Sequence, residues 1–175
     1  MRIFNSKTFN FVRTIFDKIV RKNTAYHGSP FNFNVFDVAK IGQGEGCGMR
    51  GKGIYLHEKK DFAPYYANLR SPDAPIHIGC TKPLKNPQPT IYKVKGIRKL
   101  NLKSVSEREA KNIARNQEKF CTDNPSIEGL KVTNGEIVVF PSAVNKLIIR
   151  KKYTIEKFVA RNPHINFRPW TRNMA

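Results

Sequence analysis

One carboxylate in this sequence stands at a position that suits catalysis. Glu136 follows the turn-forming dipeptide Asn134-Gly135 and precedes the apolar run Ile137 to Phe140. Asn-Gly between two apolar runs is a strong hairpin signal, so we expect Glu136 at the start of a strand. If its side chain points into a cleft with apolar walls, the low dielectric strengthens its attraction for developing positive charge. The alternative is a solvated turn residue.

Two further stretches carry groups that suit a nucleotide-like ligand. The segment Tyr26-His27-Gly28-Ser29 places an imidazole, a bare backbone and a hydroxyl at the end of one expected strand. Glycine there lets a ligand touch main-chain N–H and C=O groups. Tyr55 and Tyr66 place two phenol rings eleven residues apart, on an expected strand and the following helix. Taken singly, a strand-end histidine and core aromatic residues would explain the same positions.

Taken together and in this order, these stretches resemble the ADP-ribosyltransferase superfamily, in its H-Y-E branch of diphtheria-toxin-like and poly(ADP-ribose)-polymerase-like enzymes. His27-Gly28-Ser29 is similar to the H-G-S strand of that branch, and Tyr66 falls at its second stacking tyrosine. Gly51-Lys52-Gly53-Ile54-Tyr55 is similar to its G-K-G-I-Y strand, and Asn134 to Val139 to its glutamate-bearing strand. The glycine-rich stretch Ile41 to Gly46 adds a likeness to small transferase domains associated with bacteriophages.

The resemblance implies a site that binds NAD as a co-substrate. In that site His27 would bond a ribose hydroxyl, and Tyr55 and Tyr66 would sandwich the nicotinamide. The backbone of Gly28 would reach the carboxamide. The implied NAD site comprises His27, Gly28, Ser29, Gly53, Tyr55 and Tyr66.

The resemblance also implies a pentosyl-transferring enzyme that cleaves the nicotinamide–ribose bond and passes ADP-ribose to a macromolecular acceptor, nucleic acid or protein. Glu136, His27 and Tyr55 form the implied catalytic set. Glu136 would bond the 2′-hydroxyl of the nicotinamide ribose and stabilise an oxocarbenium-like transition state, as carboxylates do in glycoside cleavage. The chain has no room for a helical regulatory domain, so we expect transfer of single ADP-ribose units.

Two positions depart from the pattern of that branch. Position 63 is alanine, where the polymerases usually carry a serine that bonds the carboxamide, so this contact is left to Gly28 and Ser29. Asn134 stands two residues before the glutamate, where arginine-modifying relatives carry a second glutamate. The second departure argues against arginine as the acceptor.

Two other functions fit parts of the pattern. An NAD-dependent RNA 2′-phosphotransferase shares the superfamily fold and would explain a basic chain, but it needs arginines in the cleft where this sequence has Glu136. The other is a catalytically silent basic module that binds nucleic acid or ADP-ribose. Hydrolysis of NAD by the purified protein would separate the silent module from both enzymes.

The charge of the chain favours an acidic partner. Lysine and arginine number 32 against 13 aspartates and glutamates, which gives a formal net charge of +19. A field of this strength attracts polyanions from a distance, so we expect an acidic macromolecular acceptor such as nucleic acid. A solvated basic surface is the alternative. The cysteines Cys47, Cys80 and Cys121 are widely spaced, with no histidine at ligand spacing, and predict neither a disulfide framework nor a metal site.

The elements that must position these residues follow from hydrophobic periodicity and turn signals. Strands are expected at Thr24 to Gly28, Ile54 to His57, Ile76 to Cys80, Ile91 to Val94, Leu130 to Val132, Ile137 to Phe140 and Leu147 to Ile155. Helices are expected at Val12 to Val20, Lys59 to Leu69 and Ser106 to Phe120. This pattern is typical of an α+β domain, and the resemblance adds split antiparallel sheets around an NAD cleft with flanking helices.

We expect one catalytic domain over residues 23–155, preceded by a basic amphipathic helix at 1–22 and followed by a basic tail at 156–175. No apolar run approaches the ~20 residues that span a bilayer, and the first twenty residues lack the apolar core of a secretory signal. These features predict a monomer without a transmembrane segment, in the cytoplasm or delivered into the cytoplasm of a target cell as a phage or bacterial effector.

Overall fold

The computed structural model describes residues 23–42, 49–70 and 84–167. The expected N-terminal helix, most of the glycine-rich loop, the strand at Ile76 to Cys80 and the last residues of the tail lie outside this part of the chain. Within it, no helix is long and apolar enough to cross a membrane.

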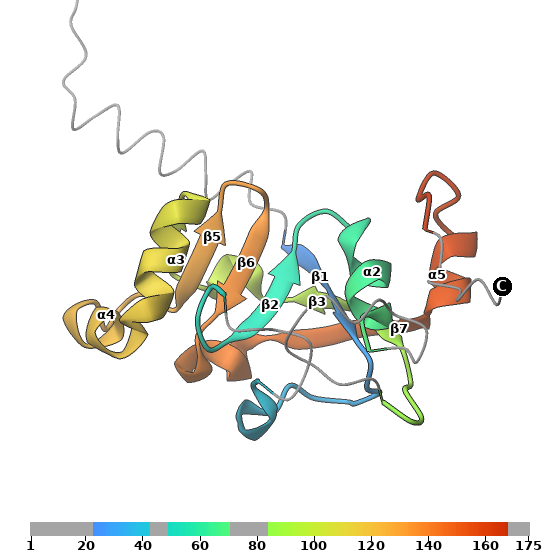
Figure 1. The fold of residues 1–175 in the computed structure, drawn as a ribbon, viewed down its shortest axis with the longest axis horizontal. Helices are drawn as coiled ribbons and strands as arrows, with labels where there is room; N and C mark the ends of the chain where they lie inside the picture. Colours follow the sequence, from blue (N-terminus) through green and yellow to red (C-terminus); the bar gives the residue numbers. More distant parts are fainter. Residues whose placement is uncertain (1–22, 43–48, 71–83, 168–175) are drawn as a thin grey trace, which may run out of the picture.

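Seven strands of the described residues form one mixed sheet in the order β4-β5-β6-β2-β1-β3-β7 (Figure 1). The strands are β1 (Thr24–Ser29), β2 (Ile54–His57), β3 (Thr90–Lys95), β4 (Leu102–Val105), β5 (Gly129–Val132), β6 (Glu136–Val139) and β7 (Ile148–Thr154). Only the β4–β5 pair is parallel among these neighbours; the others are antiparallel. The expected α+β class is therefore confirmed for the described residues.

The strand predictions hold where apolar residues alternate or run together between turn signals. β2 has the predicted bounds, and β1, β3, β5, β6 and β7 lie within a residue or two of theirs. β4 was not predicted, because Leu102 and Val105 are its only apolar residues. The hairpin predicted from Asn134-Gly135 joins β5 to β6, but its turn is one residue longer than the two-residue loop that Asn-Gly usually indicates. It consists of residues 133–135, and Gly135 takes the left-handed φ of 93° that closes the turn.

The helices differ from prediction in ways that matter for the site. α2 (Phe62–Asn68) is shorter than expected. The helix after Ser106 begins as predicted, with the Ser106 hydroxyl accepting from the Glu109 N–H, but it breaks at Asn116 into α3 (Glu107–Arg115) and α4 (Gln117–Asp123). Residues 155–160 form α5 (Ile155–Ala160), whose Phe158 is buried against the sheet, so the domain extends beyond residue 155 into the predicted tail.

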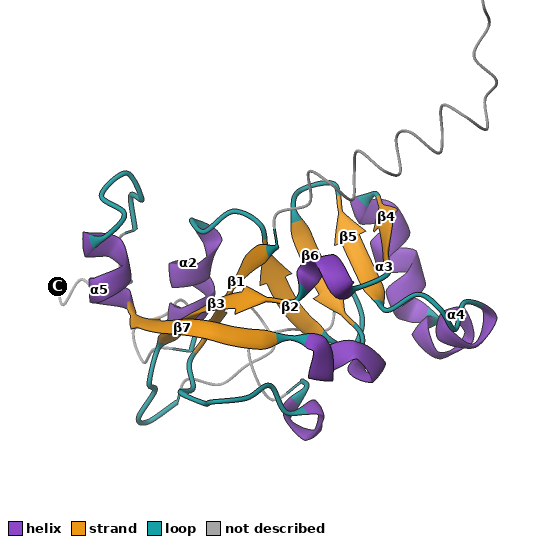
Figure 2. Ribbon diagram, turned by 180° about the vertical axis from the view of Figure 1, so that it is seen from behind, coloured by secondary structure: helices purple, strands orange, loops and turns teal. Residues whose placement is uncertain are grey.

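Helices α2 and α3 cover the same face of the sheet, at separate places. α2 packs on β1 and β3 through Ala63 and Ala67, and α3 packs on β5 through Ala110 and Ile113. Figure 1 shows β6 and β2 between these two helices. The opposite face is covered by the 31–42 segment and by 3-10 turns at 97–99 and 141–146, which Figure 2 shows from behind. The stretch of β2 and β6 between α2 and α3 is where the candidate site lies.

The expected split into separate sheets takes a different form. β1 and β2 belong to the same sheet, but they pair at one position, Tyr26 with His57. β2 and β6 pair at four, from Ile54 with Val139 to His57 with Glu136. The sheet is thus continuous on one side of β2 and nearly open on the other.

Candidate functional site

Glu136 and Tyr55 are placed on the same face of the sheet by strand register. Tyr55 pairs with Val138 and His57 pairs with Glu136. Side chains that are directly opposite share a face, and residues two apart along a strand share it too. Glu136 and Tyr55 are therefore diagonal neighbours, on the face that α2 and α3 leave uncovered between them.

The Glu136 carboxylate is largely buried and has a cation beside it. Its side chain is 13% exposed, and its Oε2 lies 3.5 Å from Nε of Arg50. Burial raises the pKa of Glu136, while the positive charge of Arg50 and a hydrogen bond from the Asn134 side chain oppose the rise. The Asn134 side-chain oxygen also accepts from the Glu136 backbone N–H at 2.9 Å, which fixes the start of β6.

Arg50 is buried between two carboxylates. Its side chain is 8% exposed, and its Nη2 lies 3.3 Å from Oε2 of Glu107 at the start of α3. Nε and Nη1 are buried and make no hydrogen bond within the described residues, so the contact with Glu136 is an ion pair without hydrogen-bond geometry. Arg50 therefore supplies positive charge next to the Glu136 carboxylate and opposes the effect of burial on its pKa.

The Tyr55 hydroxyl is anchored to the segment that carries Arg50. It donates to the Gly51 carbonyl at 2.7 Å and accepts from the Arg50 backbone N–H at 3.1 Å. Burial raises the pKa of Tyr55 to about 12, and the charges of Glu136 and Tyr66 add to the rise while Arg50 opposes it. The phenol ring is thus held in place as a neutral group with Glu136, Arg50 and Tyr66 around it.

His27 bridges the open junction between β1 and β2. Its Nδ1 lies 2.7 Å from the Tyr55 carbonyl oxygen, and because a carbonyl only accepts, Nδ1 carries the proton. Its ring packs among Phe33, Phe36 and Tyr92, and burial lowers its pKa to about 4. The imidazole is therefore neutral at pH 7. Nε2 is left as an acceptor with no partner among the described residues, a group that suits a ligand hydroxyl.

The glycines and the serine of the predicted site have packing roles. A Cβ at Gly28 would lie 2.1 Å from the Ala63 carbonyl oxygen of α2, and one at Gly53 would lie 2.5 Å from the Val139 carbonyl oxygen of β6. Ser29 is buried, and its hydroxyl accepts from the Phe31 N–H at 3.1 Å. Close packing explains both glycines whether or not a ligand approaches them.

Tyr66 reaches the same region from α2. A Cβ built on Gly28 would lie 3.0 Å from the Cβ of Tyr66, so the Tyr66 side chain starts directly above the end of β1. The residue is 37% exposed, and its ring meets that of Tyr65 edge-on at 5.7 Å. Tyr66 thus comes from the α2 side and Tyr55 from the β2 side of the open junction.

Two residues of this region were missed from the sequence. Arg50 precedes the G-K-G-I-Y stretch, and nothing in the pattern separates it from the other basic residues. Gln117 holds the Lys52 backbone in a two-bond clamp, accepting from its N–H at 2.6 Å and donating to its carbonyl at 2.8 Å. It reaches Lys52 because the helix breaks at Asn116, which hydrophobic periodicity did not indicate.

The structure therefore brings Glu136, Tyr55 and Tyr66 to one face of the sheet, near the junction between β1 and β2, whereas the His27 ring lies on the opposite face among Phe33, Phe36 and Tyr92. Gly28 and Gly53 lie beside them as close-packed backbone. No family model matches this chain, and no curated protein or solved structure matches it either.

Proposed function

We propose that this protein is an NAD-dependent mono-ADP-ribosyltransferase, with the site between α2 and α3 as its active site. The observation that carries the proposal is the meeting of a buried carboxylate, Glu136, with the anchored ring of Tyr55, next to an opening in the sheet that His27 spans. These are the residues on which the resemblance to the H-Y-E transferases rests. Glu136 and Tyr55 share one face of the sheet, and His27 reaches the Tyr55 carbonyl from the other face.

The open junction supports nicotinamide binding. In an uninterrupted antiparallel ladder, the pairing of Tyr26 with His57 would continue to Gly28 with Tyr55. The structure has no such pair, so this stretch of β1 lacks a partner in β2 and retains backbone groups for a carboxamide. Rings from Tyr55 and Tyr66 flank the gap, and offset stacking contributes about 1 kcal/mol for each aromatic pair beyond the burial of apolar area.

The neutral state of His27 supports binding of a ribose hydroxyl. Its Nδ1 proton is committed to the Tyr55 carbonyl, so Nε2 offers a lone pair. A hydroxyl donates readily to such an acceptor, whereas a protonated ring would present a second N–H instead. Because the pKa is lowered to about 4, this acceptor is present throughout the physiological pH range.

Glu136 supports the transfer step. Cleavage of the nicotinamide–ribose bond develops positive charge on the ribose, and a carboxylate in a partly buried site stabilises that charge more strongly than one in water. Arg50 favours the ionised form that this role requires. Nicotinamide leaves with the bonding electron pair, and a nucleophilic atom of the acceptor forms the new bond to the ribose carbon and gives up its proton.

The surroundings of Arg50 favour this reaction over 2′-phosphate transfer. A phosphotransferase site of this fold uses arginines to hold the phosphate, but the Arg50 charge is already matched by Glu107 and Glu136. An acidic residue at position 136 would also repel a phosphate.

The proposal is tested by nicotinamide release from NAD and by the comparison of two neighbouring tyrosines. Tyr65 and Tyr66 are adjacent on α2 and equally exposed, at 36% and 37%, but only Tyr66 is assigned to the nicotinamide. We expect Tyr66→Ala to weaken NAD binding about 5-fold to 10-fold, the loss of one stacking contact, and Tyr65→Ala to change it little. Absence of both NAD binding and nicotinamide release in the wild type would refute the proposal, as would equal effects of the two variants.

A further inference from the structure

Helix α3 presents a row of basic residues beside the candidate active site. Arg108, Lys111 and Arg115 are spaced three and four residues apart, so they lie along one side of the helix. All three are exposed. Glu107, one turn before Lys111, is the residue that contacts Arg50, and Arg50 in turn contacts Glu136. The basic row therefore begins next to the proposed catalytic carboxylate.

The charges on this helix are divided unequally between paired and unpaired groups. Both acids of α3 are used within the protein: Glu107 pairs with Arg50, and Glu109 pairs with Lys103 at 3.1 Å. None of the three bases has an acidic partner among the described residues. The negative charges of the helix are thus matched by cations within the protein, whereas the positive charges of these three residues are not matched by an acid among the described residues.

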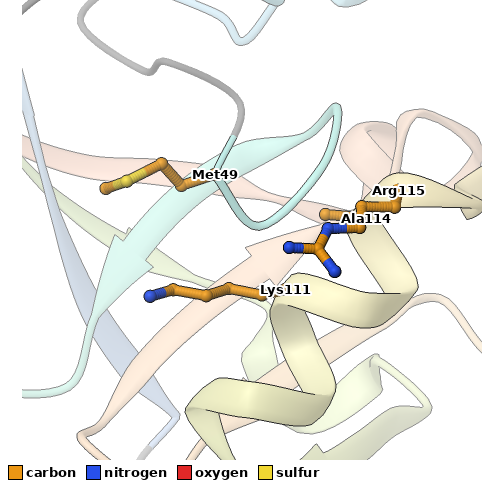
Figure 3. Close-up of a pocket in the computed structure, with 4 residues that line it drawn as sticks. All are labelled: Met49, Lys111, Ala114 and Arg115. Atoms are coloured by element: carbon orange, nitrogen blue, oxygen red, sulfur yellow. The ribbon is translucent and has the colours of Figure 1, made fainter.

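A hollow of about 360 Å³ lies between Met49 and this side of α3. It is lined by Met49, Lys111, Ala114 and Arg115, and Figure 3 shows the Lys111 and Arg115 side chains extending toward the same side as Met49. A volume near the lower end of the range for small-molecule sites admits a group of about nucleotide size. Two cations and two apolar side chains match a phosphate with an attached ring.

We propose that this hollow and the row Arg108, Lys111 and Arg115 bind the phosphate backbone of a single-stranded nucleic-acid acceptor. The inference rests on the proposed transferase function and names its acceptor class. When Lys and Arg side chains contact the phosphates of a nucleic acid, the counterions condensed on it are released, and this release drives binding. The hollow is lined by Met49, the neighbour in sequence of Arg50, whose side chain contacts Glu136, so a strand held at α3 lies on the side of the protein that carries the proposed active site.

Other exposed bases of the protein have a different explanation, and they provide a matched control. Arg150 and Lys151 are exposed on β7, which is the edge strand at the far end of the sheet from β4. Charged side chains on an edge strand prevent it from pairing with other chains. Replacing these two by glutamate changes the net charge by the same amount as replacing Lys111 and Arg115.

The test compares the double variants Lys111→Glu/Arg115→Glu and Arg150→Glu/Lys151→Glu in the full-length protein. Binding of labelled single-stranded DNA and RNA oligonucleotides is measured by fluorescence anisotropy between about 50 and 200 mM salt. We expect the α3 variant to lose at least about tenfold in affinity and to reduce the slope of log K against log salt by about 1.4, since each lost single-strand contact contributes about 0.7. We expect the β7 variant to keep the slope.

Transfer and hydrolysis separate this inference from the proposed function. The α3 variant should release nicotinamide from NAD alone at the wild-type rate while losing incorporation of ADP-ribose into the oligonucleotide. Equal loss of binding in both double variants would overturn the inference, because binding would then depend only on the net charge of the protein. Unchanged oligonucleotide binding in the α3 variant, together with transfer of ADP-ribose to a protein acceptor, would also overturn it. Oligonucleotide binding that depends on α3 in a protein that never cleaves NAD would instead refute the transferase function and leave a binding surface.

Discussion

The two sides of strand β2 are built differently. Toward β6 the ladder is complete, with four paired positions from Ile54 to His57. Toward β1 there is one paired position, and the His27 imidazole reaches across to the Tyr55 carbonyl where further backbone bonds would otherwise form. His57 is paired on both sides, with Tyr26 of β1 and with Glu136 of β6, so the difference arises because β1 and β2 diverge from this point toward Tyr55.

This difference separates two tasks of the proposed site. A carboxylate that stabilises a transition state must be held accurately, and Glu136 is held by a full ladder, by the Asn134 side chain and by Arg50. A ligand slot needs backbone and ring surface that the protein does not itself satisfy, and the β1–β2 junction provides it.

The largest effect is expected from Gly28→Ala, which disturbs the open side. A Cβ would meet the Ala63 carbonyl oxygen at 2.1 Å and the Ala67 nitrogen at 2.6 Å, both of them backbone atoms of α2 that cannot rotate away. We expect a loss of about 3 kcal/mol in the free energy of unfolding, at the upper end for overpacking, measured by urea denaturation. Gly42→Ala is the control, because it meets no atom within 4 Å and differs only by its left-handed φ of 87°. If Gly28→Ala lowered the free energy of unfolding no more than Gly42→Ala does, α2 would not pack against Gly28 as described.

A smaller effect, on pH dependence, is expected from Arg50→Met on the closed side. Arg50 opposes the rise in the pKa of Glu136 that burial causes, so its removal raises that pKa further. The carboxylate must be ionised to act, and therefore the acidic limb of kcat/KM for nicotinamide release should move to higher pH. Arg50→Lys, which keeps the charge, should leave the limb nearer its wild-type position. An unchanged limb in Arg50→Met would mean that the ion pair has no influence on Glu136.

The sign of the same shift also predicts stability. The pKa of Glu136 is raised in the folded protein, so the folded state binds a proton more tightly than the unfolded state at this residue. Its ionisation therefore costs stability as pH rises through the folded pKa. Arg50→Met enlarges that cost, and thermal melts of the variant should fall more steeply than those of the wild type over this range.

The smallest effect is expected from Gln117→Ala, which releases the clamp on the segment leading into β2. Two hydrogen bonds to Lys52 are lost, and each contributes about 1 kcal/mol or less at an exposed site. We expect a loss of about 1 kcal/mol in the free energy of unfolding and a rise in KM for NAD of a few fold, because Gly51 anchors Tyr55. Gln117→Glu should retain the bond from Lys52 N–H only. A KM unchanged in both would separate Gln117 from the site.

Short-range signals in the sequence predicted the elements that carry the site. Asn134-Gly135 between apolar runs predicted the hairpin that delivers Glu136, and Ser106 with Glu109 predicted the start of α3. Such signals depend only on residues that are close in sequence, so they can be interpreted without knowledge of the fold. They also placed Tyr55 on a strand and Tyr66 on the following helix, which are β2 and α2 in the structure.

The contacts that join these elements could not be predicted in the same way. The ion pair between Arg50 and Glu136 spans 86 residues of sequence, and neither residue type specifies the other. The close packing of α2 on Gly28 is likewise a tertiary contact that no periodicity encodes. β4 was not predicted because it contains only two apolar residues, which is too few to show alternation. Its parallel pairing with β5 is a tertiary contact that the local sequence does not indicate.

If Glu136 stabilises the transition state of NAD cleavage, its replacement should slow turnover and leave NAD affinity nearly unchanged. Glu136→Gln and Glu58→Gln are compared for NAD affinity by calorimetry and for nicotinamide release. Glu58 is a fair control because it lies at the end of the same strand pair, its backbone N–H donates to the Gly135 carbonyl, and it pairs with Lys131 at 2.7 Å. Circular dichroism melts confirm that both variants fold.

We expect Glu136→Gln to bind NAD nearly as well as the wild type but to release nicotinamide at least about 10²-fold more slowly, a loss of about 3 kcal/mol in transition-state stabilisation. We expect Glu58→Gln to retain both properties. Near wild-type release by a folded Glu136→Gln protein, with release abolished in Glu58→Gln, would contradict the assignment of Glu136 and with it the proposed mechanism.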